Sequence, residues 1–191
     1  MNKIIGILGM QGAIAEHQEI LMQIPHIKTR IVKTAKDLDC IDGLILPGGE
    51  STAIGKLLDY FSLKEILQQK IISGLPVFGT CAGLILLAKN IENETNTHLA
   101  TMDITVKRNG YGSQLDSFST NLLIPTIDKN MSIPLVFIRA PYITKTDKDV
   151  QILATLDNKI IAARQKNMLV SSFHPELTCD LRFHQYFLSM I

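Results

Sequence analysis

The sequence predicts an α/β fold with a doubly wound, mostly parallel sheet and additional antiparallel strands in the second half. Two observations lead to this prediction. In the first half, short and nearly continuous apolar runs alternate with longer amphipathic stretches, and such runs are typical of strands covered on both faces. In the second half, strand-like runs follow one another without long helical stretches between them, which favours antiparallel pairing there.

In the first half, the apolar runs predict strands over residues 3–8, 28–32, 43–46 and 75–78. Apolar residues at helical spacing predict helices over residues 13–24, 52–72 and 82–89, and the second of these is expected to break near Ser62. Because strands and helices alternate, we expect parallel strands joined by right-handed crossovers.

In the second half, strands are predicted over residues 103–107, 119–124, 135–139, 150–155, 159–164 and 168–173, and a last helix over residues 181–191. Residues 156–159 have the composition of a hairpin turn, in which Asn158 can take a positive φ. We expect residues 1–191 to form a single domain, because a typical domain has about 150 residues.

The composition excludes several classes of function. Hydrophobic residues make up 46% of the chain and charged residues 19%, so the chain can bury a core and is not disordered. Its net charge of +1 predicts no basic surface for nucleic acid or for an anionic membrane. The chain has no apolar run of about 18 residues and no signal-peptide pattern, so we expect neither a membrane span nor secretion.

The cysteines and glycines argue against bound metals and dinucleotides. Three widely spaced cysteines, Cys40, Cys81 and Cys179, fit neither a disulfide framework nor a metal knuckle, and they favour a reducing, cytoplasmic environment. The glycines at positions 6, 9 and 12 do not form the GxGxxG fingerprint. We therefore expect no metal and no cofactor, and we expect Cys40 and Cys179 to be plain packing residues.

Three unusual loops follow predicted strands: GMQG at residues 9–12, PGGES at 47–51 and GTCAG at 79–83. Ligands of parallel sheets bind at the carboxyl ends of the strands, so these loops are the expected site. The GxCxG pattern has the form of a nucleophile elbow, a strand-to-helix turn too tight for flanking side chains. Its central residue, Cys81, would lie at a helix N-terminus, where free N–H groups favour a thiolate nucleophile.

A base for this nucleophile is predicted at His174. His174, Pro175 and Glu176 follow an apolar strand, and residues i and i+2 of an extended segment point the same way. The Glu176 carboxylate can then fix the imidazole tautomer while the other ring nitrogen faces the thiol. The remaining histidines, at positions 17, 26, 98 and 184, have no such partner in sequence and are predicted to be surface or local hydrogen-bonding groups.

Acyl transfer also needs hydrogen-bond donors for the developing oxyanion. Gly48 and Gly49 can present bare backbone N–H groups beside the thiol, joined by the N–H of Ala82 directly after the nucleophile. The chain order of nucleophile, histidine and acid disfavours an α/β-hydrolase, in which the acid precedes the histidine.

The motifs extend over nearly the whole chain: GMQG at 9–12 with Glu16 and His17, PGGEST at 47–52, GTCAG at 79–83, RNGYGSQ at 108–114, FIRAP at 137–141 and SFHPEL at 172–177. Together they resemble those of the class I, triad-type glutamine amidotransferases, and within that class the glutaminase subunits of pyridoxal 5′-phosphate synthases. The resemblance implies a flavodoxin-like sheet. It also implies hydrolysis of L-glutamine to L-glutamate and ammonia by Cys81, His174 and Glu176.

The resemblance further implies which residues contact glutamine: Gly48, Gly49, Glu50, Arg108, Ile138 and Arg139. An arginine suits the α-carboxylate by bidentate pairing, and Glu50 suits the α-ammonium group. The implied partner is a synthase subunit with a TIM-barrel fold, which receives the ammonia by a sheltered route. Ser113 stands where the family usually has arginine, and weaker docking to that partner is expected if the arginine serves the contact.

Three other readings stay open at this point. The chain can serve a different synthase, such as the imidazole glycerol phosphate system, or it can be a binding module that retains the fold without the activity. A thiol-dependent redox sensor is the third, although no resolving cysteine adjoins Cys81 in sequence.

Overall fold

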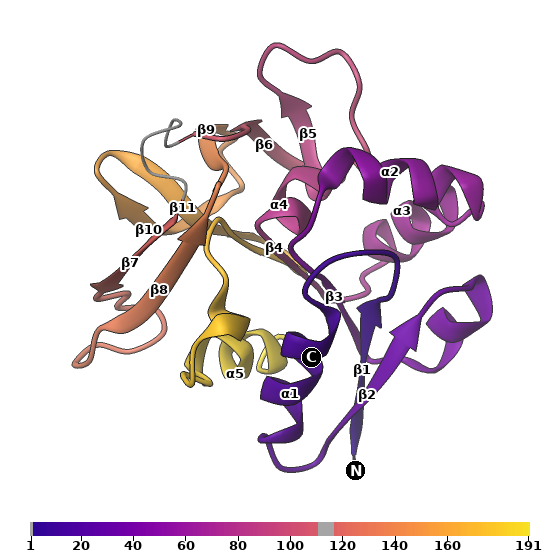
Figure 1. Cartoon of the computed structure of the whole chain (residues 1–191), viewed down its shortest axis with the longest axis horizontal. Coiled ribbons are helices and arrows are strands. Elements are labelled where there is room, and N and C mark those ends of the chain that lie inside the picture. The colour runs from indigo at the N-terminus through magenta and orange to yellow at the C-terminus, as the bar shows by residue number, and fades with distance from the viewer. Residues whose placement is uncertain (1, 111–116) are drawn as a thin grey trace.

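In the computed structural model, which describes residues 2–110 and 117–191, ten strands form one mixed sheet and two more form a separate pair (Figure 1). The parallel part has the order β2 (Ile27–Val32), β1 (Lys3–Leu8), β3 (Gly43–Leu46), β4 (Val77–Thr80) and β12 (Met168–Ser171). The chain starts at the second strand of this row, adds β2 at one edge and then continues through β3 and β4 in the other direction, which is the strand order of a flavodoxin-like sheet. The predicted fold class is confirmed.

Helices cover both faces of the parallel strands (Figure 1). Helices α1 (Ile14–Met22) and α5 (Arg182–Leu188) pack on one face, and α2 (Ser51–Tyr60), α3 (Lys64–Ile72) and α4 (Ala82–Leu87) pack on the other. A short 3-10 helix, η1 (Ala35–Cys40), lies between β2 and β3. The break predicted near Ser62 is the gap between α2 and α3, where Ser62 takes a φ of 54°.

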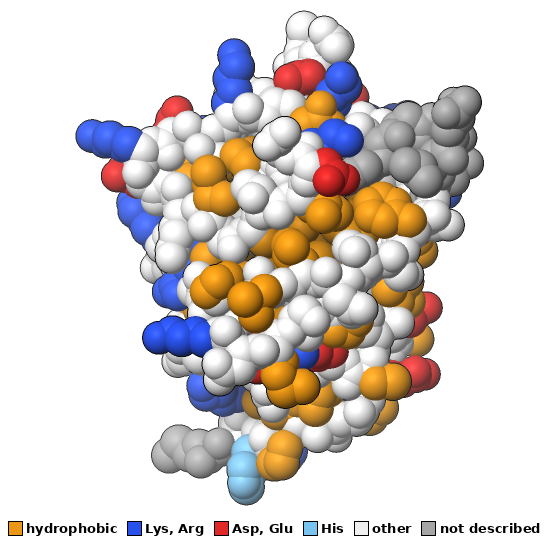
Figure 2. Space-filling model, turned by 90° about the vertical axis from the view of Figure 1, so that its left-hand side faces the viewer, with side chains coloured by type: hydrophobic (Ala, Val, Ile, Leu, Met, Phe, Trp, Pro, Cys, Tyr) orange, Lys and Arg blue, Asp and Glu red, His pale blue; other side chains and the backbone are white. Residues whose placement is uncertain are grey.

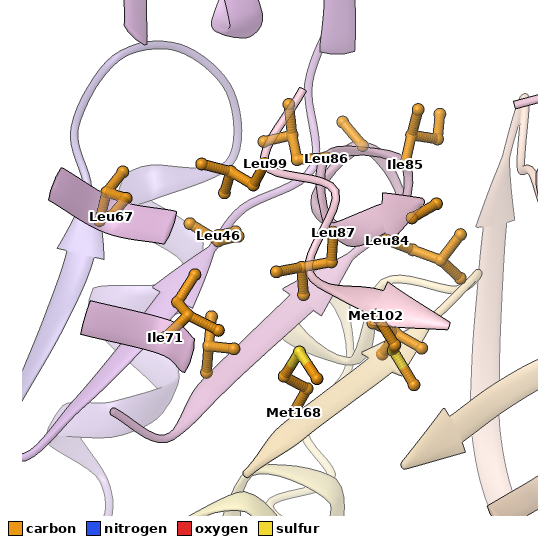
Figure 3. Close-up of a cluster of buried hydrophobic side chains, with 14 of the residues drawn as sticks. Leu46, Leu67, Ile71, Leu84, Ile85, Leu86, Leu87, Leu99, Met102 and Met168 are labelled. Carbon is orange, nitrogen blue, oxygen red and sulfur yellow. The ribbon is translucent and has the colours of Figure 1, made fainter. Parts of the chain in front are cut away.

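The strands contribute side chains to two hydrophobic clusters, one on each face of the sheet. In β3, Leu44 and Leu46 belong to the cluster under α2, α3 and α4, and Ile45 belongs to the cluster under α1 and α5. Figure 3 shows Leu46 in the first cluster, near side chains of α3 and α4. Successive strand residues point to opposite faces, so a fully apolar run is what a doubly covered strand requires.

The second half adds antiparallel strands beyond β12. The sheet continues through β11 (Lys159–Gln165), β9 (Tyr142–Thr146), β6 (Met102–Lys107) and β5 (Ala88–Ile91), with β10 (Gln151–Leu156) also paired to β11. All of these pairings are antiparallel except that of β5 with β6. Strands β7 (Ser117–Leu122) and β8 (Ile133–Ile138) form the separate pair. In the turn between β10 and β11, Asn158 has the predicted positive φ, 61°.

Several element boundaries differ from the sequence predictions. The helix predicted over residues 82–89 ends at Leu87, because the chain turns there into β5, which the sequence did not indicate. Strand β9 was also missed. Strand β4 begins and ends two residues later than predicted, because its Gly79 and Thr80 pair with β12 although neither residue is strongly apolar.

The side of the molecule that carries β7, β8 and β10 shows hydrophobic side chains across its middle and basic side chains along one edge (Figure 2). Exposed large hydrophobic residues in this part of the chain are Leu123, Met131, Ile138 and Ile152.

None of the helices in the described residues has the length and apolar character needed to cross a bilayer.

Phe78 of β4 is the residue whose truncation we expect to destabilise the fold most clearly. Its ring is fully buried, with ring centroids 5.6 Å from Phe183 and 5.7 Å from Phe187 of α5. Phe78→Ala removes these contacts and leaves a cavity, so it should lower the free energy of unfolding by about 3–5 kcal/mol in urea denaturation. A loss below about 1 kcal/mol would show that α5 does not depend on this packing.

Candidate active site

A cleft of about 610 Å³ opens at the carboxyl ends of β1, β3, β4 and β12, where the sequence placed the site. It is lined by Cys81, His174, Gly48, Gly49, Glu50, Ala82, Arg108, Ile138 and Arg139 among others. Of the predicted site residues, Glu176 alone does not line the cleft, because it lies behind His174. Five separate loops thus bring the predicted residues to one place.

Cys81 has the strained backbone that a nucleophile elbow requires. Cys81 lies between β4 and α4 and has a φ of 47° and a ψ of −98°. Such a conformation costs about 1–3 kcal/mol in a residue other than glycine. A Cβ at Gly83 would lie 2.1 Å from the carbonyl oxygen of Leu46, and one at Gly79 would lie 2.6 Å from the backbone of Gly83. Only glycines fit the two flanking positions.

His174 is held from both sides. Its backbone N–H donates to the carbonyl of Val136 in β8 at 2.8 Å, so the β7–β8 pair helps to place it. Its Nδ1 lies 2.7 Å from Oε1 of Glu176, and its ring also interacts with the side chain of Cys81. Burial of the ring opposes protonation, but the hydrogen bonds with Cys81 and Glu176 outweigh it and raise the pKa of His174 to about 10.

The local backbone around Glu176 differs from the extended segment that the sequence predicted. Strand β12 ends at Ser171, and Pro175 begins a single 3-10 turn, η2 (Pro175–Leu177). His174 is still in a non-helical conformation, so the side chains of His174 and Glu176 meet across the start of this turn.

The glycine loop after β3 touches the imidazole directly. A Cβ at Gly48 would lie 2.3 Å from Cε1 of His174, so a side chain cannot fit there. The Gly48 N–H donates to Oγ1 of Thr80 at 3.0 Å, and its carbonyl accepts from Ala13 at 3.0 Å. The prediction that the Gly48 N–H is bare is therefore wrong.

The two other proposed oxyanion donors are free. The backbone N–H groups of Gly49 and Ala82 have no acceptor within the part of the chain that the structure describes, and both residues line the cleft. They are therefore available to a ligand beside Cys81, as an oxyanion hole requires.

Arg108 and Glu50 form the charged end of the cleft. Nη2 of Arg108 lies 3.1 Å from Oε1 of Glu50, and its Nη1 contacts Thr52 at 3.1 Å and Glu94 at 3.2 Å. Glu50 also caps α2 by accepting from the N–H groups of Thr52 and Ala53. Burial raises the pKa of Glu50, but these N–H groups and Arg108 outweigh it and lower the pKa. Both charges that a zwitterionic amino acid needs are thus fixed side by side.

Ile138 and Arg139 also line the cleft. The Ile138 carbonyl oxygen lies 3.9 Å from Sγ of Cys81, and Arg139 takes a φ of 43° directly after β8. On the loop after β1, Oε1 of Gln11 accepts from the N–H of Glu50 at 2.8 Å. The residues Tyr111, Gly112, Ser113 and Gln114 of the RNGYGSQ motif lie outside the described residues.

Sequence reasoning missed two histidines beneath the site. His17 of α1 and His184 of α5 are both fully buried rather than on the surface, and Nδ1 of His17 lies 3.1 Å from Nε2 of His184. His17 follows Ile14 by three residues and precedes Leu21 by four, so it lies on the apolar face of its helix. That position was the available signal, since a polar residue on a buried face needs a partner.

The remaining cysteines and histidines lie outside the candidate site. Cys40 and Cys179 are exposed, so the prediction that they are plain packing residues is wrong. His26 is exposed, and His98 is half-buried over Gly55. Within the described residues, no group of three or more His, Cys, Asp or Glu side chains is arranged to hold a metal ion.

Gly48→Ala should lower kcat for any reaction in which Cys81 and His174 act together. The added methyl group would displace the His174 ring or the glycine loop, and a displacement of about 1 Å typically costs about 10²-fold in rate. Gly74→Ala controls for a general loss of stability: a Cβ there meets no atom within 4 Å and Gly74 does not line the cleft, but its φ of 109° strains any other residue, so kcat of the folded variant should be unchanged. Equal turnover by the Gly48→Ala variant and the wild type would show that this contact is not required.

Comparison with known proteins points to one family. A model of the SNO glutamine amidotransferase family matches residues 7–191. The chain is 53% identical over 189 residues to "Pyridoxal 5′-phosphate synthase subunit PdxT" of Ruminiclostridium cellulolyticum, covering 99% of this chain and 100% of that protein. It is 54% identical to the subunit of the same name from Carboxydothermus hydrogenoformans, over 98% of this chain and 97% of that protein.

Solved structures agree. One described as a glutamine amidotransferase has a TM-score of 0.91 and 39% identity, with 97% of each chain covered. The structure of PurLQS from Thermotoga maritima has a TM-score of 0.68 at 14% identity over 99% of each chain, which shows a shared fold alone. Because the family model matches residues 7–191, which is nearly the whole chain, this chain belongs to the SNO glutamine amidotransferase family.

Proposed function

We propose that this chain is the glutaminase subunit of a pyridoxal 5′-phosphate synthase, and that it hydrolyses L-glutamine with Cys81, His174 and Glu176. The observation that supports it most is the strained Cys81 facing a histidine whose Nδ1 lies 2.7 Å from a buried carboxylate. The relatives named PdxT, above 50% identity over nearly the whole chain, support the choice of synthase.

The chemistry follows from the placement of these groups. The Cys81 thiolate attacks the side-chain amide carbon and a C–S bond forms. The resulting oxyanion accepts hydrogen bonds from the N–H groups of Gly49 and Ala82. The His174 imidazolium gives its proton to the amide nitrogen, the C–N bond breaks and ammonia leaves. Neutral His174 then takes a proton from water, which cleaves the thioester to glutamate and restores the thiolate–imidazolium pair.

The charged end of the cleft selects an α-amino acid. In the proposed complex, Arg108 pairs with the α-carboxylate and Glu50 with the α-ammonium group, while Ile138 and Arg139 line the wall along the side chain. In the free chain these two charges pair with each other. Glutamine binding would replace that exposed ion pair, whose loss costs little.

The proposed partner is a synthase subunit with a TIM-barrel fold, which receives ammonia along a route closed to water. Bulk water would protonate ammonia and end its use as a nucleophile. Docking is also proposed to orient the Gly48–Gly49 loop, whose Gly48 N–H is held by Thr80 in the free chain.

Ammonia release from glutamine, measured with and without the synthase subunit, tests this function. We expect release that depends on Cys81 and that rises when the synthase subunit is added. Release that persists in a Cys81→Ala variant would contradict the proposed chemistry. Equal rates with and without the synthase subunit would contradict the proposed role of docking.

A further inference from the structure

His17 and His184 form a buried chain of polar atoms that leads to the back of the triad. Nε2 of His17 lies 3.2 Å from Oγ1 of Thr80 and 3.6 Å from Oε2 of Glu176. Its Nδ1 lies 3.1 Å from Nε2 of His184. Thr80 in turn accepts the N–H of Gly48, so one imidazole adjoins both the catalytic carboxylate and the glycine loop.

Both imidazoles are neutral in this setting. Burial is the main cause that holds the pKa of His17 well below its usual value, and electrostatic repulsion between its protonated form and the imidazoles of His184 and His174 acts in the same direction. Burial alone lowers the pKa of His184 to about 3. Each ring therefore carries one N–H, and the question is which nitrogen carries it.

The arrangement of the remaining atoms decides the tautomers. If His17 carried its proton on Nδ1, it would donate to His184, and His184 would then bury an N–H at Nδ1 that has no partner among the described residues. In that state the lone pair of His17 Nε2 would also face the Glu176 carboxylate. With the proton on Nε2, His17 donates toward Thr80 and Oε2 of Glu176, and accepts from His184. The unpartnered atom of His184 is then the lone pair of Nδ1, and an unmade acceptor costs less than a buried, unpaired donor. Oε2 of Glu176, which has no hydrogen bond among the described residues, then faces an N–H at 3.6 Å rather than a lone pair.

We propose that His17 is a positioning residue of the glutaminase: His184 fixes its proton on Nε2, and this N–H donates to the Thr80 hydroxyl and faces the rear oxygen of Glu176 at 3.6 Å. The inference rests on the proposed function, because it concerns the geometry of the same triad. Glu176 uses its other oxygen, Oε1, for His174. The N–H dipole of His17 favours the orientation of the carboxylate that turns Oε2 toward it, and the hydrogen bond to Thr80 holds the Gly48 peptide against the imidazole.

The tautomer can be tested in the unmodified protein. Nitrogen-15 NMR of the histidine-labelled chain separates protonated from bare ring nitrogens, and the His17 signals are assigned by their loss in a His17→Gln variant. We expect the proton on Nε2 of His17 and on Nε2 of His184. A proton on Nδ1 of His17 would overturn the proposal whatever the activity of the protein.

A matched pair of variants tests the role in catalysis. His17→Gln places an amide N–H near the position of Nε2, whereas His17→Asn places it near Nδ1. With the synthase subunit present, we expect His17→Asn to lower kcat about 10-fold to 100-fold and His17→Gln to retain most of it. KM for glutamine should stay within about twofold of the wild-type value in both variants, because residue 17 does not line the cleft.

His184 offers a second pair in case a His17 variant does not fold. His184→Gln can still donate to His17, and His184→Leu cannot, so only the second should lower kcat. Equal kcat within either folded pair would overturn the proposal. Absence of glutaminase activity in the wild type would instead contradict the proposed function, and the NMR result would still decide the tautomer.

Discussion

Replacing Cys81 with alanine or serine should lower ammonia release from glutamine by at least about 10³-fold, the largest effect we expect from any single substitution. Alanine removes the nucleophile. Serine keeps the shape, but its hydroxyl does not ionise beside His174 as a thiol can. Glutamine should still bind, because the charged pair of Arg108 and Glu50 is untouched.

The measurement is glutaminase activity in the presence of the synthase subunit, with glutamine binding followed by calorimetry. Cys40→Ala and Cys179→Ala serve as controls, because both thiols are exposed and neither lines the cleft. Full activity of the Cys81→Ala variant, or a comparable loss in a control, would contradict the assignment of the nucleophile.

Glu176→Gln should lower kcat by about 10²-fold to 10⁴-fold, with a shifted pH profile. The amide can donate to Nδ1 of His174, which reverses the tautomer and turns a protonated nitrogen toward the thiol. The carboxylate is also one of the groups that raise the pKa of His174 to about 10. Its loss should let that pKa fall toward 6.5, so the imidazolium needed to protonate the leaving nitrogen is lost at lower pH.

The matching measurement is kcat/KM between about pH 6 and 10 for the wild type and the variant. The decline on the alkaline side should begin at lower pH in the Glu176→Gln variant. Glu50→Gln is a useful comparison, because it alters another carboxylate of the cleft and should mainly raise KM. An unchanged alkaline limb in Glu176→Gln would show that the carboxylate does not act on His174.

The strands of the parallel sheet could be predicted because burial on both faces dictates their composition. Strands β1 and β3 have the predicted bounds, because in both of them the apolar run begins and ends where the hydrogen-bonded pairing with neighbouring strands begins and ends. Strand β9 could not be found in this way. Three of its five residues, Thr144, Lys145 and Thr146, are polar, and the pairing of this strand with β6 is set by tertiary contacts.

The same distinction applies to the site. Cys81 and His174 follow strands that the sequence identifies, and the carboxyl ends of parallel strands meet at one edge of a sheet. The contact between His17 and His184 joins residues 167 positions apart, on two helices that meet only because both pack on the same face. No local pattern reports such a pairing. The hydrogen bond from the Gly48 N–H to Thr80 likewise joins a loop to the end of a different strand, β4.

The most direct test is to trap the covalent intermediate. Glutamine turnover by the complex is stopped with acid, and the digested protein is examined by mass spectrometry for a glutamyl thioester. The proposed mechanism predicts one added glutamyl group on the peptide that contains Cys81, and none on the peptides with Cys40 or Cys179. Turnover with no adduct at Cys81, or with the adduct at another cysteine, would contradict it.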